Sequence, residues 1–331
     1  MNGVLVVDKP EGPTSHDVVT LTRRALGVSR VGHTGTLDPL ATGVLPLVIG
    51  RATRLAQFLT ASDKTYAATI AFGRSTDTYD AKGRQVAACE QRPTRQQLDA
   101  ALEKFRGEFE QTPPAFSAKN IDGERSYERA RKAERAVLPP PRPKSVMVNA
   151  RRLEVVAFDG ETATLSLTVT AGFYVRSLAH DLGEMLGCGA LLLALRRTRS
   201  GEFGLDIAVP LAEVLQSKRE DLAGRLIPMG ALLSDLPAVT LKGPATLERL
   251  KNGVEMGPND FVTPVGTHVA APEAPSNYLT AAPEAPPNYL TAAPEAPQRI
   301  IVRLLDQAGG LVGLARPGKT PGTLHGWVVL G

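Results

Sequence analysis

The order of strand-like and helix-like segments along the chain is the feature that most limits its fold. Residues Lys64–Phe72 alternate between apolar and polar side chains, as expected for a strand with one buried face. Two further strand patterns, over 145–157 and 162–170, precede a helix pattern over 174–186 and another strand pattern over 191–197. These segments do not form a regular strand–helix–strand repeat. We therefore predict an α+β fold with a mixed, largely antiparallel sheet.

Local signals place further helices and turns. Ser15 is positioned to cap a helix, and Thr94 with Gln97 has the spacing of a capping box at the start of another. Residues 30–43 are rich in Gly, Thr and Pro and have no apolar period, so we predict a loop there. This loop leads directly into an apolar strand over 44–49.

The sequence changes character after about residue 230, which indicates a second domain. A chain of 331 residues is long enough for two domains. Short strand patterns separated by Gly and Pro predict a small β-barrel over 231–331, after a first domain over 1–230. A repeat, APEAPSNYLTA, APEAPPNYLTA and APEAP, interrupts this region over 270–297. Its Pro and Ala content predicts an extended insertion in a hairpin.

Positive charge is concentrated in the first part of the chain. The formal net charge is +4; residues 1–230 hold 31 Lys and Arg against 26 Asp and Glu, whereas 231–331 hold 7 against 8. The segment 119–144 alone has 8 basic and 4 acidic residues. Such a segment is either a solvated helix face or a contact surface for a polyanion.

Several classes of protein have no support in the sequence. The two cysteines, Cys89 and Cys188, lie far apart and outside any metal-type cluster, so we expect neither a disulfide framework nor a metal site. There is no nucleophile elbow and no phosphate-binding loop. The N-terminus lacks a basic region followed by a long apolar one, and no apolar run is long enough to span a membrane. We expect a soluble cytoplasmic protein.

The segment GHTGTLDPLATGVLPLVIG, residues 32–50, contains the strongest candidate for a functional residue. It places one carboxylate, Asp38, among small and turn-forming residues just before a buried strand. Catalytic groups are often held in this way, on a loop with rigid support. An Asp that caps a turn before Pro39 would have the same surroundings. The segment has no second carboxylate at a short fixed spacing, which weighs against a glycosidase mechanism.

Five ordered motifs over residues 3–230 resemble the TruB family of pseudouridine synthases. GHTGTLDPLATGVL is similar to the active-site motif of that family, and VVDKPEGPTSHDVV to its N-terminal K-P-x-G-x-T-S motif. The other three are KTYAATIAFGRSTDTYDAKG, TPPAFSAKNIDGERSYERAR and GFYVRSLAHDLGEMLGCGALLLALRRTRSGEF. Residues beyond 230 match loosely, through RLKNG, and resemble the small RNA-binding PUA-type barrel. The repeat is outside the family pattern, and Tyr79 stands where that pattern has Gly.

The resemblance implies isomerisation of a uridine in the T-loop of tRNA, position 55, to pseudouridine. The base is cut from the ribose at N1, rotates, and is rejoined through C5. Nothing is oxidised and no group is added, so we expect no cofactor. Asp38 is the implied catalytic carboxylate. It could attack C1′ or C6, or act as a base at C2′, and the sequence leaves these three open.

The resemblance also assigns roles to residues around Asp38. Arg176 is implied to pair with Asp38, since a guanidinium favours and orients an ionised carboxylate.

Tyr66 is implied to stack on the extruded uracil and to exchange a proton through its hydroxyl. Tyr174 and Leu195 are implied to line the uracil pocket, and His33 to fill the gap left by the flipped nucleotide. Without the resemblance, Tyr66 and Leu195 would be interpreted as core residues and His33 as a solvated loop residue. The same match assigns Lys9 and Pro10 a supporting role beneath the active-site loop.

Three other functions remain open from the sequence. The protein could be a pseudouridine synthase that acts on rRNA or uses a guide RNA, a non-catalytic RNA-binding protein or RNA chaperone, or a carboxylate-dependent glycosidase. The motif residues around Asp38 and the basic segment 119–144, which resembles an RNA-clamping insertion, favour the tRNA enzyme. We expect a monomer whose partner is the T-arm of tRNA, without a membrane, guide RNA or obligate protein partner.

The basic segment generates a prediction about salt dependence. Neutralising its four clustered cations together should weaken tRNA binding while leaving the single-turnover rate near wild type; these are Arg129, Arg131, Lys132 and Arg135. If two or three of them contact phosphates, the slope of log affinity against log salt should shrink by roughly two units. Filter binding over a salt series measures this slope. An unchanged slope would favour the solvated face.

Overall fold

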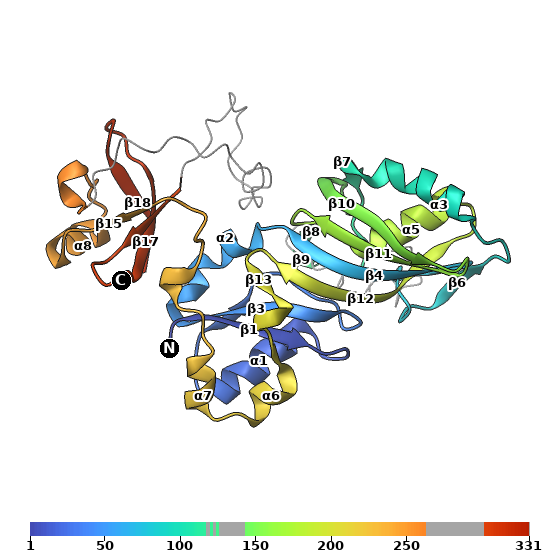
Figure 1. Ribbon diagram of the computed structural model, residues 1–331, viewed down its shortest axis with the longest axis horizontal. Coiled ribbons are helices and arrows are strands. Elements are labelled where there is room, and N and C mark those ends of the chain that lie inside the picture. The colour runs from blue at the N-terminus through green and yellow to red at the C-terminus, as the bar shows by residue number, and fades with distance from the viewer. Residues whose placement is uncertain (117–119, 122–123, 126–142, 263–300, 331) are drawn as a thin grey trace.

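The computed structural model describes residues 1–116, 120–121, 124–125, 143–262 and 301–330. Figure 1 shows one long twisted sheet through the middle of the molecule, with helices at both ends and a second, smaller sheet beside it. The long sheet has ten strands: β1 (Gly3–Lys9), β2 (Val31–His33), β3 (Thr42–Ile49), β4 (Lys64–Phe72), β7 (Gly107–Gln111), β10 (Val146–Phe158), β11 (Thr162–Val169), β12 (Ala190–Ser200), β13 (Phe203–Gly204) and β14 (Val209–Pro210).

The strand order confirms the predicted α+β class. The main path runs β14-β1-β3-β12-β4-β11-β10-β7, with β2 paired to β3 and β13 paired to β12. Only the β1–β14 and β3–β12 pairs are parallel, so the sheet is mixed and largely antiparallel. Strand β12 joins the two halves because it pairs with β3 on one side and with β4 on the other.

The helices cover the two ends of this sheet. Contacts and Figure 1 place α1 (Ser15–Leu26), α6 (Leu211–Gln216) and α7 (Arg219–Gly224) together near β1, and α3 (Arg95–Leu102) and α5 (Val175–Met185) near β10 and β12. Between β3 and β4 lie η1 (Gly50–Leu55) and α2 (Ala56–Thr60). The predicted capping box at the start of α3 is confirmed.

Two local predictions near the N-terminus were wrong. The N-cap of α1 is Thr14, which forms a capping box with Asp17, and Ser15 is the first helical residue. The hydroxyl of Ser15 instead bonds with the backbone of Leu37, because the tertiary structure brings these two residues together. The predicted loop over 30–43 contains strand β2, which forms because its backbone pairs with β3.

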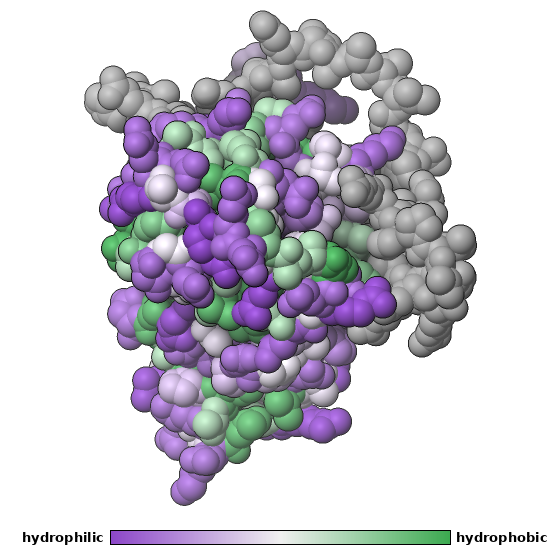
Figure 2. Space-filling view, turned by 90° about the vertical axis from the view of Figure 1, so that its right-hand side faces the viewer, coloured by the Kyte–Doolittle hydropathy of each residue, from purple (hydrophilic) through white to green (hydrophobic). Residues whose placement is uncertain are grey.

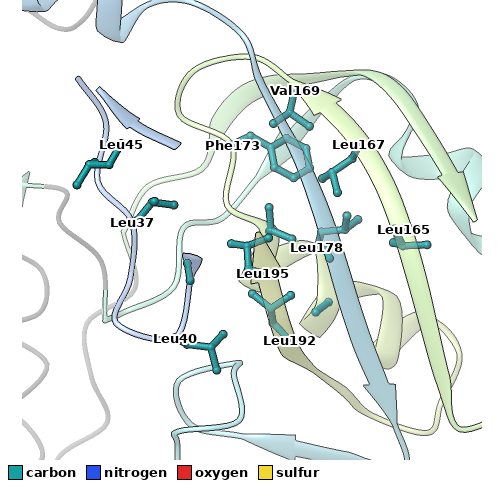
Figure 3. Packing of buried hydrophobic residues seen from close by; sticks show 14 of the residues in the cluster. Leu37, Leu40, Leu45, Leu165, Leu167, Val169, Phe173, Leu178, Leu192 and Leu195 are labelled. Carbon is teal, nitrogen blue, oxygen red and sulfur yellow. The ribbon is translucent and has the colours of Figure 1, made fainter. Parts of the chain in front are cut away.

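The main hydrophobic core lies between the long sheet and the helices. It joins residues from both halves of the sheet with α1, α3 and α5. Leu37 and Leu40, from the segment between β2 and β3, belong to the same cluster as Leu195 of β12 and Leu178 of α5 (Figure 3). The segment that carries Asp38 is therefore anchored in the core on both sides of that residue.

The second sheet has four strands in the order β15-β16-β17-β18. These are β15 (Ala238–Thr240), β16 (Val302–Leu305), β17 (Leu311–Pro317) and β18 (Leu324–Val329), accompanied by α8 (Pro244–Lys251) and η5 (Pro258–Asp260). The predicted closed barrel is not confirmed, because β15 and β18 do not pair with each other in the described residues. One of the short strand patterns after residue 230, over 262–265, lies largely outside those residues.

The smaller sheet packs directly on the larger one. A second apolar cluster contains Val4 and Val6 of β1 together with Leu311 and Leu314 of β17. Trp327 of β18 meets the ring of Phe58 edge-on, with ring centroids 5.0 Å apart. Because these contacts are apolar and partly buried, they hold the smaller sheet at one position on the larger.

The structure also contains several short elements. They are β5 (Arg74–Thr76), β6 (Gln85–Ala88), η2 (Glu103–Phe105), β8 (Asn120–Ile121), β9 (Glu124–Arg125), η3 (Leu205–Ile207) and η4 (Met229–Ala231). On the face shown in Figure 2, apolar residues occur in small groups among hydrophilic ones. In the described part of the chain, no helix is long and apolar enough to cross a membrane. The repeat over 270–297 and most of the basic segment, including its four clustered cations, lie outside the described residues.

The start of β3 generates a prediction about stability. Gly43 has a φ of +100°, and a Cβ there would lie 2.2 Å from the carbonyl oxygen of Arg197 on β12. Gly43→Ala should therefore lower the free energy of unfolding by about 1–3 kcal/mol beyond the cost of the backbone conformation alone. Gly160→Ala is the matched control, because Gly160 has a φ of +94° and open space at the Cβ position. Denaturant unfolding of both variants tests this; equal losses would contradict the close approach of β3 and β12.

Candidate active site

Asp38 lies on a short segment between β2 and β3 that is fixed at several points. The side chains of Leu37, Leu40 and Ala41 are buried in the main core. The amide of Ala41 donates to the carbonyl of Asp38 at 3.0 Å, which closes a tight turn. The side chain of Asp38 remains 37% exposed. The core therefore holds the backbone on both sides of a carboxylate that solvent and substrate can reach.

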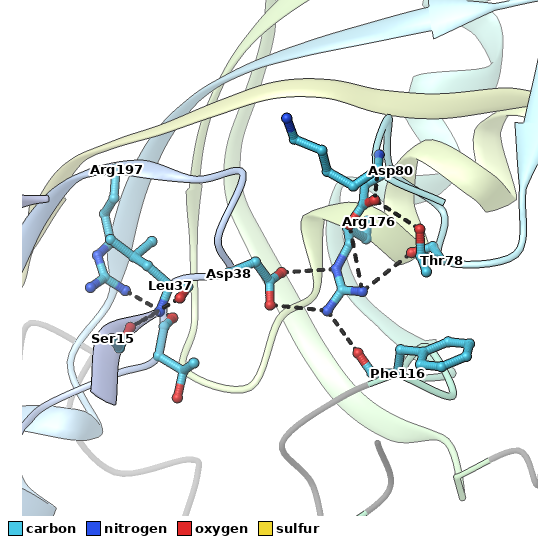
Figure 4. A network of polar contacts seen from close by, with 10 residues as sticks. Ser15, Leu37, Asp38, Thr78, Asp80, Phe116, Arg176 and Arg197 are labelled. Atoms are coloured by element: carbon cyan, nitrogen blue, oxygen red, sulfur yellow. Dashed lines mark hydrogen bonds and ion pairs between the residues drawn. The ribbon is translucent and has the colours of Figure 1, made fainter. Parts of the chain in front are cut away.

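The hydroxyl of Ser15 holds the residue before Asp38. It donates to the carbonyl of Leu37 at 3.0 Å and accepts from the amide of Leu37 at 2.8 Å. Both backbone groups are buried, and a buried backbone group without a partner is costly. The first turn of α1 thus fixes the backbone next to the carboxylate (Figure 4).

Two buried cations support the same segment from behind. Lys9 donates to the carbonyl of Pro10 at 2.8 Å and lies 3.5 Å from that of Pro39. Arg197 donates to the carbonyls of Val44 at 2.7 Å and Gly35 at 3.1 Å. Burial lowers the pKa of Lys9 to about 8, although the nearby Asp38 acts in the opposite direction. These cations bind backbone oxygens, so the segment is held without a competing bond to the carboxylate of Asp38.

Arg176 forms a two-point ion pair with Asp38. Its Nε lies 2.8 Å from one carboxylate oxygen, and its Nη2 donates to the other at 3.2 Å. Arg176 is in the first turn of α5, where the helix dipole disfavours a cation, and its side chain is only 7% exposed. The guanidinium also donates to the carbonyls of Thr78 and Phe116 (Figure 4). The predicted pairing is therefore present, in the planar geometry that matches a carboxylate.

A second carboxylate, Asp80, lies on the other side of Arg176. Its Oδ2 is 3.8 Å from Nη1 of Arg176, and Asp80 is buried. The hydroxyl of Thr78 and the amide of Lys82 donate to its Oδ1. Sequence reasoning did not assign Asp80 a role. The available signal was the run of Thr, Asp and Gly in STDTYDAKG, which is typical of a turn that orients its own carboxylates.

The other predicted residues lie on elements that adjoin the Asp38 segment. Tyr66 of β4 is in register with Arg197 of β12, the residue that binds the segment from behind. Leu195 is two residues earlier on β12 and is buried in the main core. Tyr174 is the N-cap of α5, and its backbone amide and carbonyl both bond with the side chain of Gln111. Of the predicted residues that the structure describes, Arg176 is the one that bonds to Asp38.

His33 ends β2, at the entrance to the segment. Its Nδ1 accepts from the amide of Gly35 at 3.3 Å. Burial, followed by the positive charges of Arg197 and His16, lowers its pKa below the usual value. The neutral ring is therefore favoured at this position. No group of three or more His, Cys, Asp and Glu residues suited to a metal ion occurs among the residues that the structure describes.

The two hydrogen bonds between the hydroxyl of Ser15 and the backbone of Leu37 generate a prediction. Ser15→Ala leaves the buried amide and carbonyl of Leu37 without their partner, so the free energy of unfolding should fall by about 1–3 kcal/mol. Ser217→Ala is the control, because the hydroxyl of Ser217 makes one exposed bond, to the carbonyl of Glu213. Thermal and denaturant unfolding of the two variants compares them. If Ser15→Ala lowers the free energy of unfolding no more than Ser217→Ala does, the two bonds between Ser15 and Leu37 contribute nothing to stability.

Comparison with known proteins identifies the family. Residues 23–175 match the N-terminal domain of the TruB family pseudouridylate synthases, and 176–234 match the C-terminal domain of tRNA pseudouridylate synthase B. A tRNA pseudouridine synthase B of Solibacter usitatus is 49% identical over 79% of this chain and 88% of its own length. That of Symbiobacterium thermophilum is 46% identical over 77% and 83%.

A solved structure shares the fold at lower identity. It is described as an H/ACA RNP bound to a substrate RNA containing 2'-deoxyuridine. One chain of it is 22% identical, with a TM-score of 0.67, and the match covers 99% of this chain and 85% of that one. This structure shows the fold alone. The family models and the relatives from S. usitatus and S. thermophilum show that this chain belongs to the TruB family of pseudouridylate synthases, which are isomerases.

Proposed function

We propose that this protein converts the uridine at position 55, in the T-loop of tRNA, to pseudouridine, with Asp38 as the catalytic carboxylate. The relatives from S. usitatus and S. thermophilum are named for action on tRNA and match most of the chain. In the reaction the bond between N1 and C1′ breaks, the base turns, and C5 bonds to C1′. C5 loses a proton and N1 gains one, so the product is an isomer and no external group is consumed.

The ion pair between Asp38 and Arg176 is the observation that supports this proposal most strongly. Two bonds from one guanidinium fix the plane of the carboxylate, while 37% of the side chain stays exposed. A reacting group that is held in one orientation and open on one side suits a substrate base that leaves its stack to reach it. Asp38 would attack C1′ or C6, or remove a proton from C2′.

The surrounding residues would hold the uracil. The ring of Tyr66 would stack on the base, and its hydroxyl would exchange a proton with it. Tyr174 and Leu195 would line the pocket, and neutral His33 would occupy the gap left in the RNA. Support for these roles comes from their positions on β4, at the N-terminus of α5, on β12 and on β2, the elements that adjoin the Asp38 segment.

RNA affinity would come from surfaces outside the pocket. Residues 231–331 would form an RNA-binding domain of PUA-like type, next to a catalytic domain over 1–230. The basic segment 119–144 would clamp the T-arm through phosphate contacts, which supply affinity without sequence information. The protein would act as a cytoplasmic monomer on tRNA without a guide RNA.

Substitution of Asp38 tests the catalytic assignment. Asp38→Asn keeps the shape of the side chain but removes the anion, so the rate should fall by at least about 10²–10⁴-fold while tRNA binding persists. The assay is single-turnover pseudouridine formation on unmodified tRNA, with the modified nucleotide mapped in the product. Pseudouridine formation at the wild-type rate would refute the role of Asp38.

A matched control separates the rate loss caused by removing the Asp38 carboxylate from the effect of breaking an Asp–Arg ion pair in general. Asp63 pairs with Arg151 at 2.7 Å, outside the contacts described for Asp38. Asp63→Asn removes one carboxylate from an Asp–Arg pair in the same way, so it should keep the wild-type rate at saturating tRNA. The same assay with unmodified tRNA as the only RNA present tests the need for a guide, and modification that appears only after a guide RNA is added would contradict the proposal.

A further inference from the structure

Tyr79 adopts a backbone conformation that its residue type disfavours. Its φ is +65°, in the left-handed region. A residue with a Cβ pays a conformational cost there that Gly does not pay. The neighbouring bonds within the loop over 76–83 would be available to Gly as well, so they do not explain the tyrosine. The side chain of Tyr79 must contribute something that offsets the strain.

The ring of Tyr79 stacks on His180 of α5. The ring centroids are 3.8 Å apart and the planes differ by 4°. His180 follows Arg176 by four residues on the same helix, so the two side chains lie one above the other on one helix face. The stack therefore places the loop over 76–83 on the face of α5 that carries Arg176.

This loop binds Arg176 through the residues on either side of Tyr79. The carbonyl of Thr78 accepts from Nη1 at 3.2 Å, and Oδ2 of Asp80 lies 3.8 Å from the same atom. The carbonyl of Tyr79 itself accepts from the amide of Leu192 on β12 at 3.0 Å. The backbone of Tyr79 is thus fixed to the sheet, and its ring is fixed to the helix.

Other bonds of the loop do not replace the stack. The hydroxyl of Thr76 donates to the carbonyl of Asp80, and the hydroxyl of Thr78 to its carboxylate. Both bonds lie within the loop and set its shape. The amide of Ala81 also donates to the carbonyl of Leu192 at 3.0 Å, which attaches the loop a second time to β12 and not to α5. The hydrogen bond from Arg176 to the carbonyl of Thr78 and the ion pair of Arg176 with Asp80 connect this loop to α5. Both involve the guanidinium whose orientation determines how Arg176 meets Asp38.

We propose that Tyr79 and His180 form a positioning pair for the isomerisation: their stack holds the loop over 76–83 on α5 and so sets the direction in which Arg176 presents its guanidinium to Asp38. The proposal rests on the proposed role of Asp38. Tyr79 acts through Thr78, Asp80 and Arg176, not on the substrate.

Paired substitutions test the stack. Tyr79→Gly removes the ring and also relieves the strain, whereas Tyr79→Phe keeps a stacking ring. Aromatic pairs of this kind contribute enough to change a rate by about two- to tenfold. We expect Tyr79→Gly to lose that factor in the single-turnover rate at saturating tRNA, with an unchanged dissociation constant, and Tyr79→Phe to recover most of it. His180→Ala should match Tyr79→Gly, and the double variant should lose no more than either single one.

A spectroscopic measurement separates positioning from general loosening. The Nε–H resonance of Arg176, in protein with isotope-labelled arginine, should shift in Tyr79→Gly and His180→Ala and return in Tyr79→Phe. If Tyr79→Gly does not fold, His180→Ala and His180→Phe provide the same comparison, since Phe keeps a ring at position 180.

The outcomes distinguish this proposal from its premise. Wild-type rates in Tyr79→Gly and His180→Ala, or additive losses in the double variant, would overturn the positioning pair. A change confined to the dissociation constant would overturn it too, because it would assign Tyr79 to RNA contact. Activity in Asp38→Asn, measured beside them, would instead overturn the catalytic assignment of Asp38.

Discussion

The ion pair between Asp38 and Arg176 is the interaction on which the architecture of this site depends. The two residues are 138 positions apart in the sequence, and the pair forms only if the β2–β3 segment and α5 are both in place. An arginine that is almost fully buried needs compensation for the loss of its hydration. Here it receives two carboxylates, Asp38 and Asp80, and two backbone carbonyls. The bond that orients the carboxylate thus also stabilises the buried cation.

Among the residues that the structure describes, the other groups around Asp38 bond to the backbone and not to its carboxylate. Lys9 and Arg197 are buried directly behind its segment, yet both bond to backbone carbonyl oxygens. Ser15 satisfies both backbone groups of Leu37. The carboxylate is therefore left with one strong partner and one open side.

The smaller sheet is attached to the larger one at two places outside the Asp38 segment. Arg303 of β16 bonds to four backbone carbonyls between residues 230 and 236, the stretch that connects the two sheets. The apolar cluster shared by β1 and β17 adds a second attachment. A surface on the smaller sheet is consequently held at a constant position relative to Asp38. That arrangement suits a substrate that must be bound at one place and modified at another.

The sequence alone determined those features that depend on neighbouring residues. Alternation over Lys64–Phe72 and the capping box of Thr94 and Gln97 are local patterns, and the strand and helix that they predict are present. The five ordered motifs were sufficient to predict the family, and the resemblance led to Arg176 as the partner of Asp38. Tertiary structure decided what depends on segments far apart in the chain. Ser15 binds Leu37 instead of capping α1, and β2 exists because β3 lies beside it.

Asp80 and Tyr79 illustrate the same limit within the site. Nothing in the residues near Asp80 indicates that Arg176 lies beside it, and the strain at Tyr79 makes sense only once His180 is stacked on its ring. The predicted barrel is not confirmed for a related reason: pairing between β15 and β18, which the described residues do not show, is a long-range property that short strand patterns do not contain. Local propensity acts over a few residues, whereas charge pairing, ring stacking and strand closure depend on groups that only the folded chain brings together.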